Sequence, residues 1–393
     1  MASFQAADFV RNVMENSERP LIGGPVPEGT IGLSSGDPDF RTPEHVREAM
    51  IAAVRQGYSN YPPGNGDPEL LSALANLLKR RYGVDWSPND ITVTNGGGGA
   101  LYSSIGAFLN PGDTVLVPQP TFSSYRDVAM LHGAEVVWVP LDNEWHLDLD
   151  ALREAARASN AKMMIICNPN NPTGVVYNRE ELEGAARIAQ EFNLLVLADE
   201  VYDHLILDDI PFVSTMEIEG FRDRLLYCNS FSKTFAMTGW RMGWVAASPG
   251  LIGAVSRVAR STGGGVNWAM QRAGIAAITG PMEPTEAMRL EYAARRDLID
   301  ELLEGAEGIS WVRPQGAFYA FLKYDADIPA REMTSRLRDR GVLLRSGTEY
   351  GPGGEGYVRV AFATDRDSLT EGMLRVRSTL LEAIQGRRKV GVS

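Results

Sequence analysis

From about residue 90 onward, short apolar segments rich in β-branched residues alternate with longer stretches in which apolar residues recur at helical spacing. Segments of the first kind indicate buried strands, and stretches of the second kind indicate helices. This alternation is typical of a largely parallel sheet covered by helices on both faces, so an α/β fold is predicted. The seven predicted strands are Ile91 to Thr94, Thr114 to Val117, Glu135 to Val139, Met163 to Cys167, Leu194 to Ala198, Leu225 to Asn229 and Gly243 to Ala246.

A break in this pattern around Pro281 to Pro284 is predicted to separate two domains. A chain of 393 residues exceeds the usual length of one domain. We expect residues 46–283 to form a large domain and residues 284–393 a smaller α+β domain, against which the N-terminal segment 1–45 packs. Two helices stand out within this plan: Asn178 can cap a crossover helix that ends near Asn193, and a final amphipathic helix carries Leu369, Met373, Val376 and Leu380.

Composition and charge exclude several classes of protein. The formal net charge of -12 opposes general adhesion to nucleic acid or to an anionic membrane, so neither is an expected partner. The first twenty residues lack the uninterrupted apolar block of a signal peptide or membrane span. The two cysteines, Cys167 and Cys228, each lie in a predicted buried strand, which gives no support to a disulfide framework. We therefore expect a reducing, cytoplasmic location, and no metal site.

The segment that follows the predicted strand Leu225 to Asn229 carries the sharpest chemical signal. It reads Ser-Phe-Ser-Lys-Thr-Phe-Ala-Met-Thr-Gly-Trp-Arg from Ser230 to Arg241. Lys233 thus lies just past a strand end, where α/β sheets bind ligands. Desolvation there would lower its pKa and supply a neutral amine for a Schiff base with an aldehyde. Taken alone, a surface lysine on a loop would be the better interpretation.

Two further strand ends change that judgement. Asp199 and Tyr202 follow one strand, and Asn171 lies in the turn Asn-Pro-Asn-Asn-Pro-Thr-Gly after another. Since parallel strand ends share one edge of a sheet, these groups are predicted to meet Lys233. A carboxylate at this place can pair with a protonated ring nitrogen, as pyridoxal 5′-phosphate (PLP) requires to act as an electron sink. The alternatives are a helix N-cap for the aspartate and a simple Asx-rich turn for the asparagine.

Two more segments can bind anions. Gly96 to Gly99 stand between a predicted strand and a helix predicted from about Ala100 to Leu109, so bare amides at a helix N-terminus form an anion cradle. A flexible turn is the commoner cause of such a glycine run. Near the C-terminus, Arg359 interrupts a strand-like apolar alternation and can bind a carboxylate bidentately. An internal salt bridge is its structural alternative.

Together these motifs resemble the class I PLP-dependent aminotransferases of fold type I, the aspartate aminotransferase family. The resemblance covers Gly36 to about Phe362, with the motifs in the family's order. It implies a large PLP-binding domain with a mostly parallel seven-stranded sheet and a smaller α+β domain. It also implies an enzyme that moves an amino group between an L-amino acid and a 2-oxo acid.

The resemblance assigns roles to individual residues. Lys233 would hold PLP as a Schiff base and shuttle the proton between Cα and C4′, while Asp199 would pair with the pyridine nitrogen. Tyr202 and Asn171 would bind the phenolic oxygen, and Phe122 would stack on the ring unless it is plain core. Relatives often carry a hydroxyl in the glycine run, and its absence here leaves the phosphate to the remaining candidates: Gly97, Gly98, Gly99, Ser230, Ser232 and Arg241.

For the substrate, the resemblance assigns the α-carboxylate to Arg359, with the Gly36 amide and Asn171 nearby. Tyr61 resembles the tyrosine that reaches the phosphate of a neighbouring subunit, which implies a homodimer with shared active sites. Side-chain selectivity and the role of Thr262 to Gly265 stay open.

Two rival functions are considered. The same cofactor and residues could serve elimination, replacement, cyclisation or carbon-carbon bond formation at Cβ or Cγ, because all these reactions share a Cα carbanion. A non-catalytic effector domain of a transcription regulator would need an attached DNA-binding domain. The residues before Gly36 are too few and insufficiently basic to form one.

Overall fold

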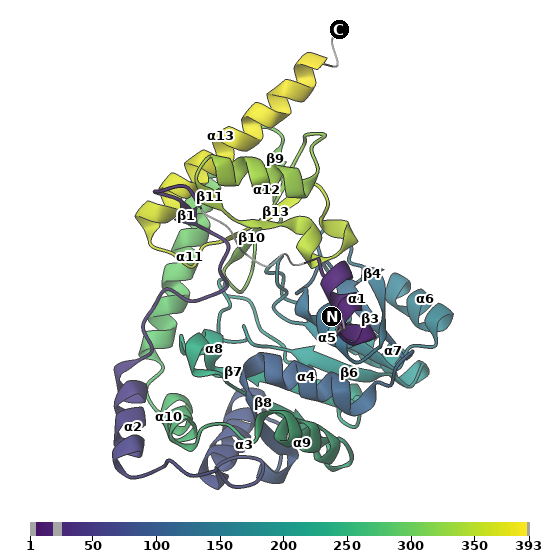
Figure 1. Cartoon of the computed structure of the whole chain (residues 1–393), viewed down its shortest axis with the longest axis vertical. Helices are drawn as coiled ribbons and strands as arrows, with labels where there is room; N and C mark the ends of the chain where they lie inside the picture. Colours follow the sequence, from purple (N-terminus) through teal and green to yellow (C-terminus); the bar gives the residue numbers. More distant parts are fainter. Residues whose placement is uncertain (1–4, 19–25, 391–393) are drawn as a thin grey trace, which may run out of the picture.

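The computed structural model describes residues 5–18 and 26–390, with side chains described up to residue 386. Figure 1 shows one layered α/β part below and a smaller part above, with the long helix α11 (Glu283–Leu303) running from one to the other. The N-terminal helix α1 (Asp8–Asn16) lies against α5 (Ser124–Leu131). Among the described residues, no helix is both long enough and apolar enough to cross a membrane.

A seven-stranded sheet forms the centre of the larger part and contains all seven predicted strands. Its order is β2-β8-β7-β6-β5-β3-β4. Only β8 runs antiparallel to its neighbours; the other strands are parallel. The observed bounds differ from the predicted ones by at most two residues: β2 (Ile91–Asn95), β3 (Thr114–Gln119), β4 (Glu135–Pro140), β5 (Met163–Cys167), β6 (Leu195–Asp199), β7 (Leu225–Ser230) and β8 (Met242–Ala247).

Helices cover both faces of this sheet, because the central strands are apolar on both sides. Along β5, Met163 and Ile165 pack into one core cluster, whereas Met164 and Ile166 pack into another. Residues of α4 (Gly96–Phe108), α5 and α9 (Pro249–Gly263) complete the first cluster. The second cluster is completed by α2 (Glu44–Arg55), α3 (Pro68–Tyr82), α6 (Leu149–Ser159), α7 (Arg179–Glu191) and α10 (Trp268–Thr279).

The smaller part is built on a four-stranded antiparallel sheet of order β12-β13-β10-β9. Its own apolar core includes Leu369, Met373, Val376 and Leu380, the predicted face of the last helix. The N-terminal strand β1 (Ile31–Gly32) pairs with β11 (Val342–Leu343) of this part. Its other elements are β9 (Ile309–Ser310), β10 (Tyr319–Tyr324), β12 (Arg345–Ser346), β13 (Tyr357–Ala361), α12 (Ala330–Asp339) and α13 (Arg366–Val390). The division into domains at residues 46–283 and 284–393 stays a prediction.

Local signals explain several helix ends. Asn178 caps α7 through a capping box with Glu181, as predicted. The expected start of α4 near Ala100 was wrong, because the helix begins at Gly96. The segment Thr262 to Gly265 ends α9, with Gly264 in the left-handed conformation (φ 65°). The short helices are α8 (Phe231–Thr234), η1 (Pro88–Asp90), η2 (Thr215–Glu217), η3 (Glu219–Phe221), η4 (Thr238–Trp240), η5 (Gly347–Tyr350) and η6 (Pro352–Gly354).

Candidate active site

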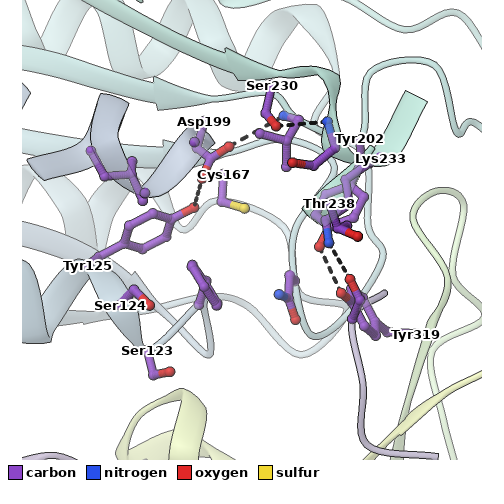
Figure 2. A pocket seen from close by; sticks show the side chains of 18 of the residues that line it. Ser123, Ser124, Tyr125, Cys167, Asp199, Tyr202, Ser230, Lys233, Thr238 and Tyr319 are labelled. Atoms are coloured by element: carbon purple, nitrogen blue, oxygen red, sulfur yellow. Dashed lines mark hydrogen bonds between the residues drawn. The ribbon is translucent and has the colours of Figure 1, made fainter. Parts of the chain in front are cut away.

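A cavity of about 600 Å³ opens where the carboxyl ends of β5, β6 and β7 meet the N-terminus of α4 and the smaller sheet. Figure 2 shows side chains from these elements pointing into it. The structure brings together most of the predicted site residues in its lining: Gly36, Gly97, Gly98, Phe122, Asn171, Asp199, Tyr202, Ser230, Ser232, Lys233, Arg241 and Arg359. Two predicted residues lie elsewhere. Gly99 borders a separate hollow, and Tyr61 is 90% exposed.

Asp199 is the last residue of β6 and lines the cavity from the large sheet. It is in register with Cys167 of β5 and Cys228 of β7. Burial raises its pKa to about 6, an effect partly offset by hydrogen bonds from Tyr125 and the Val201 amide. The Tyr125 hydroxyl donates to Asp199 Oδ2 at 2.8 Å, and Figure 2 shows the two groups facing each other. The result is a buried carboxylate with few protein partners.

Lys233 lies in α8, the single helical turn that follows β7. Its Nζ donates a hydrogen bond to the Gly36 carbonyl and lies 6.0 Å and 5.7 Å from the ring centres of Tyr202 and Phe318. Burial lowers its pKa to about 8, opposed by the negative charge of Asp37. The amine is therefore easier to deprotonate than an ordinary lysine, as the sequence predicted.

The first turn of α4 forms an anion cradle with groups from two neighbouring strands. Gly97 and Gly98 line the cavity. The Arg241 guanidinium lies against Gly96: a Cβ added to this glycine would be only 2.6 Å from Arg241 Nη2. Gly96 itself has φ +72°, which favours glycine. Ser230 Oγ accepts a hydrogen bond from the Ser232 amide at 2.9 Å. Helix-end amides, serines and a guanidinium thus converge on one end of the cavity.

Arg359 lies in the middle of β13, on the opposite wall. It donates to Asn171 Oδ1 at 3.2 Å and to the Ser34 carbonyl at 2.6 Å. The rings of Tyr319 and Tyr350 lie 4.2 Å and 5.1 Å from its guanidinium carbon. Within the described residues it forms no salt bridge, and its buried Nε has no hydrogen-bond partner. This arginine is therefore not neutralised by an internal ion pair.

Tyr202 lies near the junction of the two walls. Its hydroxyl shares a hydrogen bond of 2.8 Å with the Tyr319 hydroxyl, and burial raises its pKa well above the usual value. It is therefore a neutral hydroxyl that can donate a proton into a hydrogen bond. Phe122 precedes α5 and also lines the cavity, with its ring edge-on to Tyr125.

Sequence reasoning missed several side chains that line the cavity. Tyr125 lies in the same segment as Phe122 and at the start of a helix, but nothing local indicated that it faces Asp199. Arg345 lies in the two-residue strand β12 and Glu349 lies four residues later in η5, and so short a strand and turn give no sign of where their side chains point. Their location depends on how the smaller sheet meets the larger one. Among the described residues, no cluster of three or more potential ligands for a metal ion occurs.

Comparisons with known proteins show the family of this chain. The profile of the family described as aminotransferase class I and II matches residues 28–376. An aspartate aminotransferase of Pyrococcus abyssi is 37% identical over 90% of this chain and 92% of its own length. Aromatic-amino-acid aminotransferase 2 of Thermococcus litoralis is 35% identical over 90% and 92%. The crystal structure of an aromatic aminotransferase from Pyrococcus horikoshii superposes with a TM-score of 0.86 at 35% identity, covering 90% of this chain and 96% of that one.

The chain therefore belongs to the class I and II aminotransferase family and has the fold of the type I transferases. It is an enzyme that transfers amino groups, as its sequence motifs predicted.

Proposed function

We propose that this enzyme binds PLP covalently through Lys233 and uses it to transfer an amino group from an L-amino acid to a 2-oxo acid. One observation carries the proposal. The amine of Lys233 and the buried carboxylate of Asp199 line the same cavity, beside a cradle of helix-end amides. A lysine with a lowered pKa and a carboxylate with a raised one are the two groups that such a cofactor needs.

The residues fit the phosphate end of PLP. The amides of Gly97 and Gly98 lie at the N-terminus of α4, where the helix dipole favours an anion. Arg241 provides a permanent positive charge next to them, and Ser230 and Ser232 provide hydroxyls. Gly99 lies outside the cavity lining, so it belongs to the first turn of α4 but is not assigned a direct contact with the phosphate.

The residues also fit the ring. Asp199 is buried without a cationic partner close enough to form a salt bridge among the described residues, so a protonated ring nitrogen would relieve its desolvation. The Tyr125 hydroxyl holds the carboxylate in place from its other side. Tyr202 and Asn171 would bind the phenolic oxygen, and Phe122 would cover the ring. When bound, PLP supplies an electron-withdrawing ring that stabilises negative charge on the substrate Cα.

The protein side chains divide the remaining work between them. The Lys233 amine takes the proton from the substrate Cα, a role for which a pKa of about 8 is suited near neutral pH. Arg359 binds the α-carboxylate bidentately, because within the described residues no carboxylate forms a salt bridge with it. The Gly36 amide lies in the same cavity lining and is assigned a place near the same carboxylate. Holding both ends of the amino acid orients the Cα–H bond toward the lysine.

We further propose that the enzyme works as a homodimer with shared active sites. Tyr61 is 90% exposed, which is unusual for an aromatic ring and is expected of a residue that a second copy covers. The proposal assigns Tyr61 to the phosphate site of the neighbouring subunit. Two free buried cysteines support a reducing, cytoplasmic location.

The test is a visible-absorbance titration of the PLP-loaded enzyme with candidate amino acids. Transamination converts the cofactor to its amine form and restores the original absorbance when a 2-oxo acid is added. Elimination or replacement chemistry instead releases ammonia or a leaving group without accumulation of the amine form. A protein that binds PLP but responds to no amino acid would refute the proposal.

A further inference from the structure

A buried ion pair lies in the cavity and has no role in the scheme above. Arg345 Nη1 donates to Glu349 Oε2 at 3.2 Å, and both side chains are less than a tenth exposed. Both residues line the cavity. Burying two charges is costly even when they are paired, and apolar residues in their place would often be at least as stable, so this pair calls for a functional explanation.

The pair lies directly beside the proposed α-carboxylate site. Arg345 of β12 and Arg359 of β13 are register partners in an antiparallel sheet. Side chains of such partners lie on the same face, with Cβ atoms about 5 Å apart. The guanidinium of Arg345 therefore lies within the reach of a substrate whose α-carboxylate is held by Arg359.

Glu349 is held in place by the backbone as well as by Arg345. Its Oε1 accepts a hydrogen bond from the Ser346 amide at 3.3 Å, as part of the capping box that opens η5. A cap of this kind contributes about 1 kcal/mol to stability, so the carboxylate does not swing away from the arginine without loss. The guanidinium of Arg345 thus faces a carboxylate group that the backbone holds in place.

The positive charges that line the cavity can be counted under the proposed function, on which this inference rests. Lys233 binds the cofactor, Arg241 the phosphate and Arg359 the α-carboxylate. Within the described residues, Arg345 is the one other cation in the cavity lining, and Glu349 already neutralises it. A second substrate carboxylate would find no unmatched positive charge and would lie close to Glu349.

We propose that the Arg345–Glu349 pair determines substrate specificity by keeping the side-chain end of the cavity electrically neutral. The preferred substrates are then amino acids with uncharged side chains, and aspartate and glutamate are disfavoured. The remaining walls suit such side chains, because Leu101, Val128 and Tyr350 are apolar or aromatic.

The first experiment measures kcat/KM of the PLP-loaded wild-type enzyme for phenylalanine, leucine and glutamine against aspartate and glutamate. Pyruvate is the acceptor throughout, so that no dicarboxylate is needed for the second half-reaction. We expect the uncharged donors to exceed aspartate by about 10-fold or more, which corresponds to about 1.4 kcal/mol. Calorimetry adds a readout independent of turnover: 3-phenylpropanoate should bind more tightly than succinate.

The second experiment uses four variants, of which Arg345→Gln removes the cation alone. Glu349→Gln keeps the shape and the capping oxygen but leaves Arg345 charged, so the ratio of kcat/KM for aspartate to that for phenylalanine should rise about 10-fold. The double variant Arg345→Gln/Glu349→Gln should return the ratio to the wild-type value. Glu332→Gln is the matched control, since Glu332 forms a similar i,i+4 pair with Arg336 on the exposed face of α12, and its ratio should not change.

Three results would overturn the inference: equal use of aspartate and phenylalanine by the wild type, an unchanged ratio in Glu349→Gln, or a selective loss of aspartate turnover in an Arg345→Gln variant. The last would show that Arg345 already binds a distal carboxylate. Failure with every amino acid would instead refute the proposed aminotransferase scheme. Circular dichroism and the succinate affinity keep a poorly folded variant from being mistaken for any of these outcomes.

Discussion

The cavity has two walls that are built in different ways. The first, here called the cofactor wall, consists of residues at strand ends and first helical turns of the large sheet: Gly97, Gly98, Asp199, Ser230 and Lys233. The second, the substrate wall, consists of long or aromatic side chains on the smaller sheet and the turn beside it: Tyr319, Arg345, Glu349, Tyr350 and Arg359. Backbone geometry fixes the first wall, whereas side-chain pairing fixes the second. Substitutions in the substrate wall can therefore change substrate selectivity without altering the residues proposed to bind the cofactor.

The largest expected effect is on the cofactor wall. Lys233→Ala removes the group proposed as both covalent anchor and base, so kcat should fall by about 10⁴-fold or more. Steady-state kinetics with added PLP measures this loss. Lys162→Ala, which replaces an exposed lysine paired with Asp113, is the control and should keep its turnover. Turnover that survives in Lys233→Ala would contradict the assignment of the base.

Asp199→Asn should have the next largest effect. The amide is similar in shape but cannot neutralise a protonated ring nitrogen, so we expect kcat to fall by about 10²- to 10³-fold while some cofactor is retained. Stopped-flow kinetics and cofactor absorbance separate the two quantities. Wild-type turnover with normal cofactor affinity would show that this carboxylate is only structural.

Arg359→Gln probes the substrate wall. Losing a bidentate partner for the α-carboxylate should lower kcat/KM by about 100-fold, mainly through KM. Cofactor binding on the other wall should be less affected, so the PLP affinity is the control measurement. If kcat fell while KM stayed unchanged, Arg359 would not act mainly in substrate binding, and the division of roles between the two walls would be wrong.

Tyr125→Phe should change the pH dependence of stability. In the cofactor-free protein, Asp199 has a pKa of about 6, above its ordinary value of 3.8. The folded state therefore holds a proton that the unfolded state has released, and this group makes stability fall as pH rises from about 4 to about 6. Because the Tyr125 hydroxyl lowers this pKa, its removal should extend the fall to higher pH.

The measurement is urea unfolding of wild type and variant between pH 5 and pH 7. The variant should lose more stability than the wild type over this range, because its Asp199 keeps the proton to a higher pH. Parallel pH profiles, displaced by a constant amount, would show that the hydroxyl contributes to packing alone.

The smallest effect is expected outside both walls. Gly264 ends α9 with φ 65°, and a Cβ added there would contact no other atom, so Gly264→Ala should cost about 1 kcal/mol through backbone strain alone. Gly253→Ala in the same helix would also contact no other atom, and should be neutral or stabilising. Denaturant midpoints compare the two. Equal effects would mean that the left-handed cap is unimportant.

The cofactor wall could be predicted from the sequence, and much of the substrate wall could not. Lys233 and Asp199 follow apolar strands, and parallel strand ends must share an edge, so local pattern sufficed. The contact between Arg345 and the cavity depends on the register of β12 with β13 and on the meeting of two sheets. The apolar pattern of the five residues from Arg345 to Glu349 does not show which side chains face the cavity.

Two segments, α4 and Thr262 to Gly265, differ from what the sequence predicted or were left without a predicted role. The helix α4 was expected near Ala100 because glycines are poor helix formers, but the first turn needs few internal hydrogen bonds and begins at Gly96. The Thr262 to Gly265 segment had no predicted role, because glycine is common both at helix ends and in binding loops. The seven strands were found because buried β-branched segments bounded by turns have few alternative conformations.

The continuous helix α11 has a mechanical consequence. Its Thr285 donates a hydrogen bond to the Thr234 carbonyl in the turn that carries Lys233, and farther along Arg295 binds both Asp39 and the Phe362 carbonyl. A helix of 21 residues spans about 30 Å and behaves as a stiff rod. Unfolding of either part would remove contacts that this helix makes to the other, so we expect the two cores to melt together in one cooperative calorimetric transition.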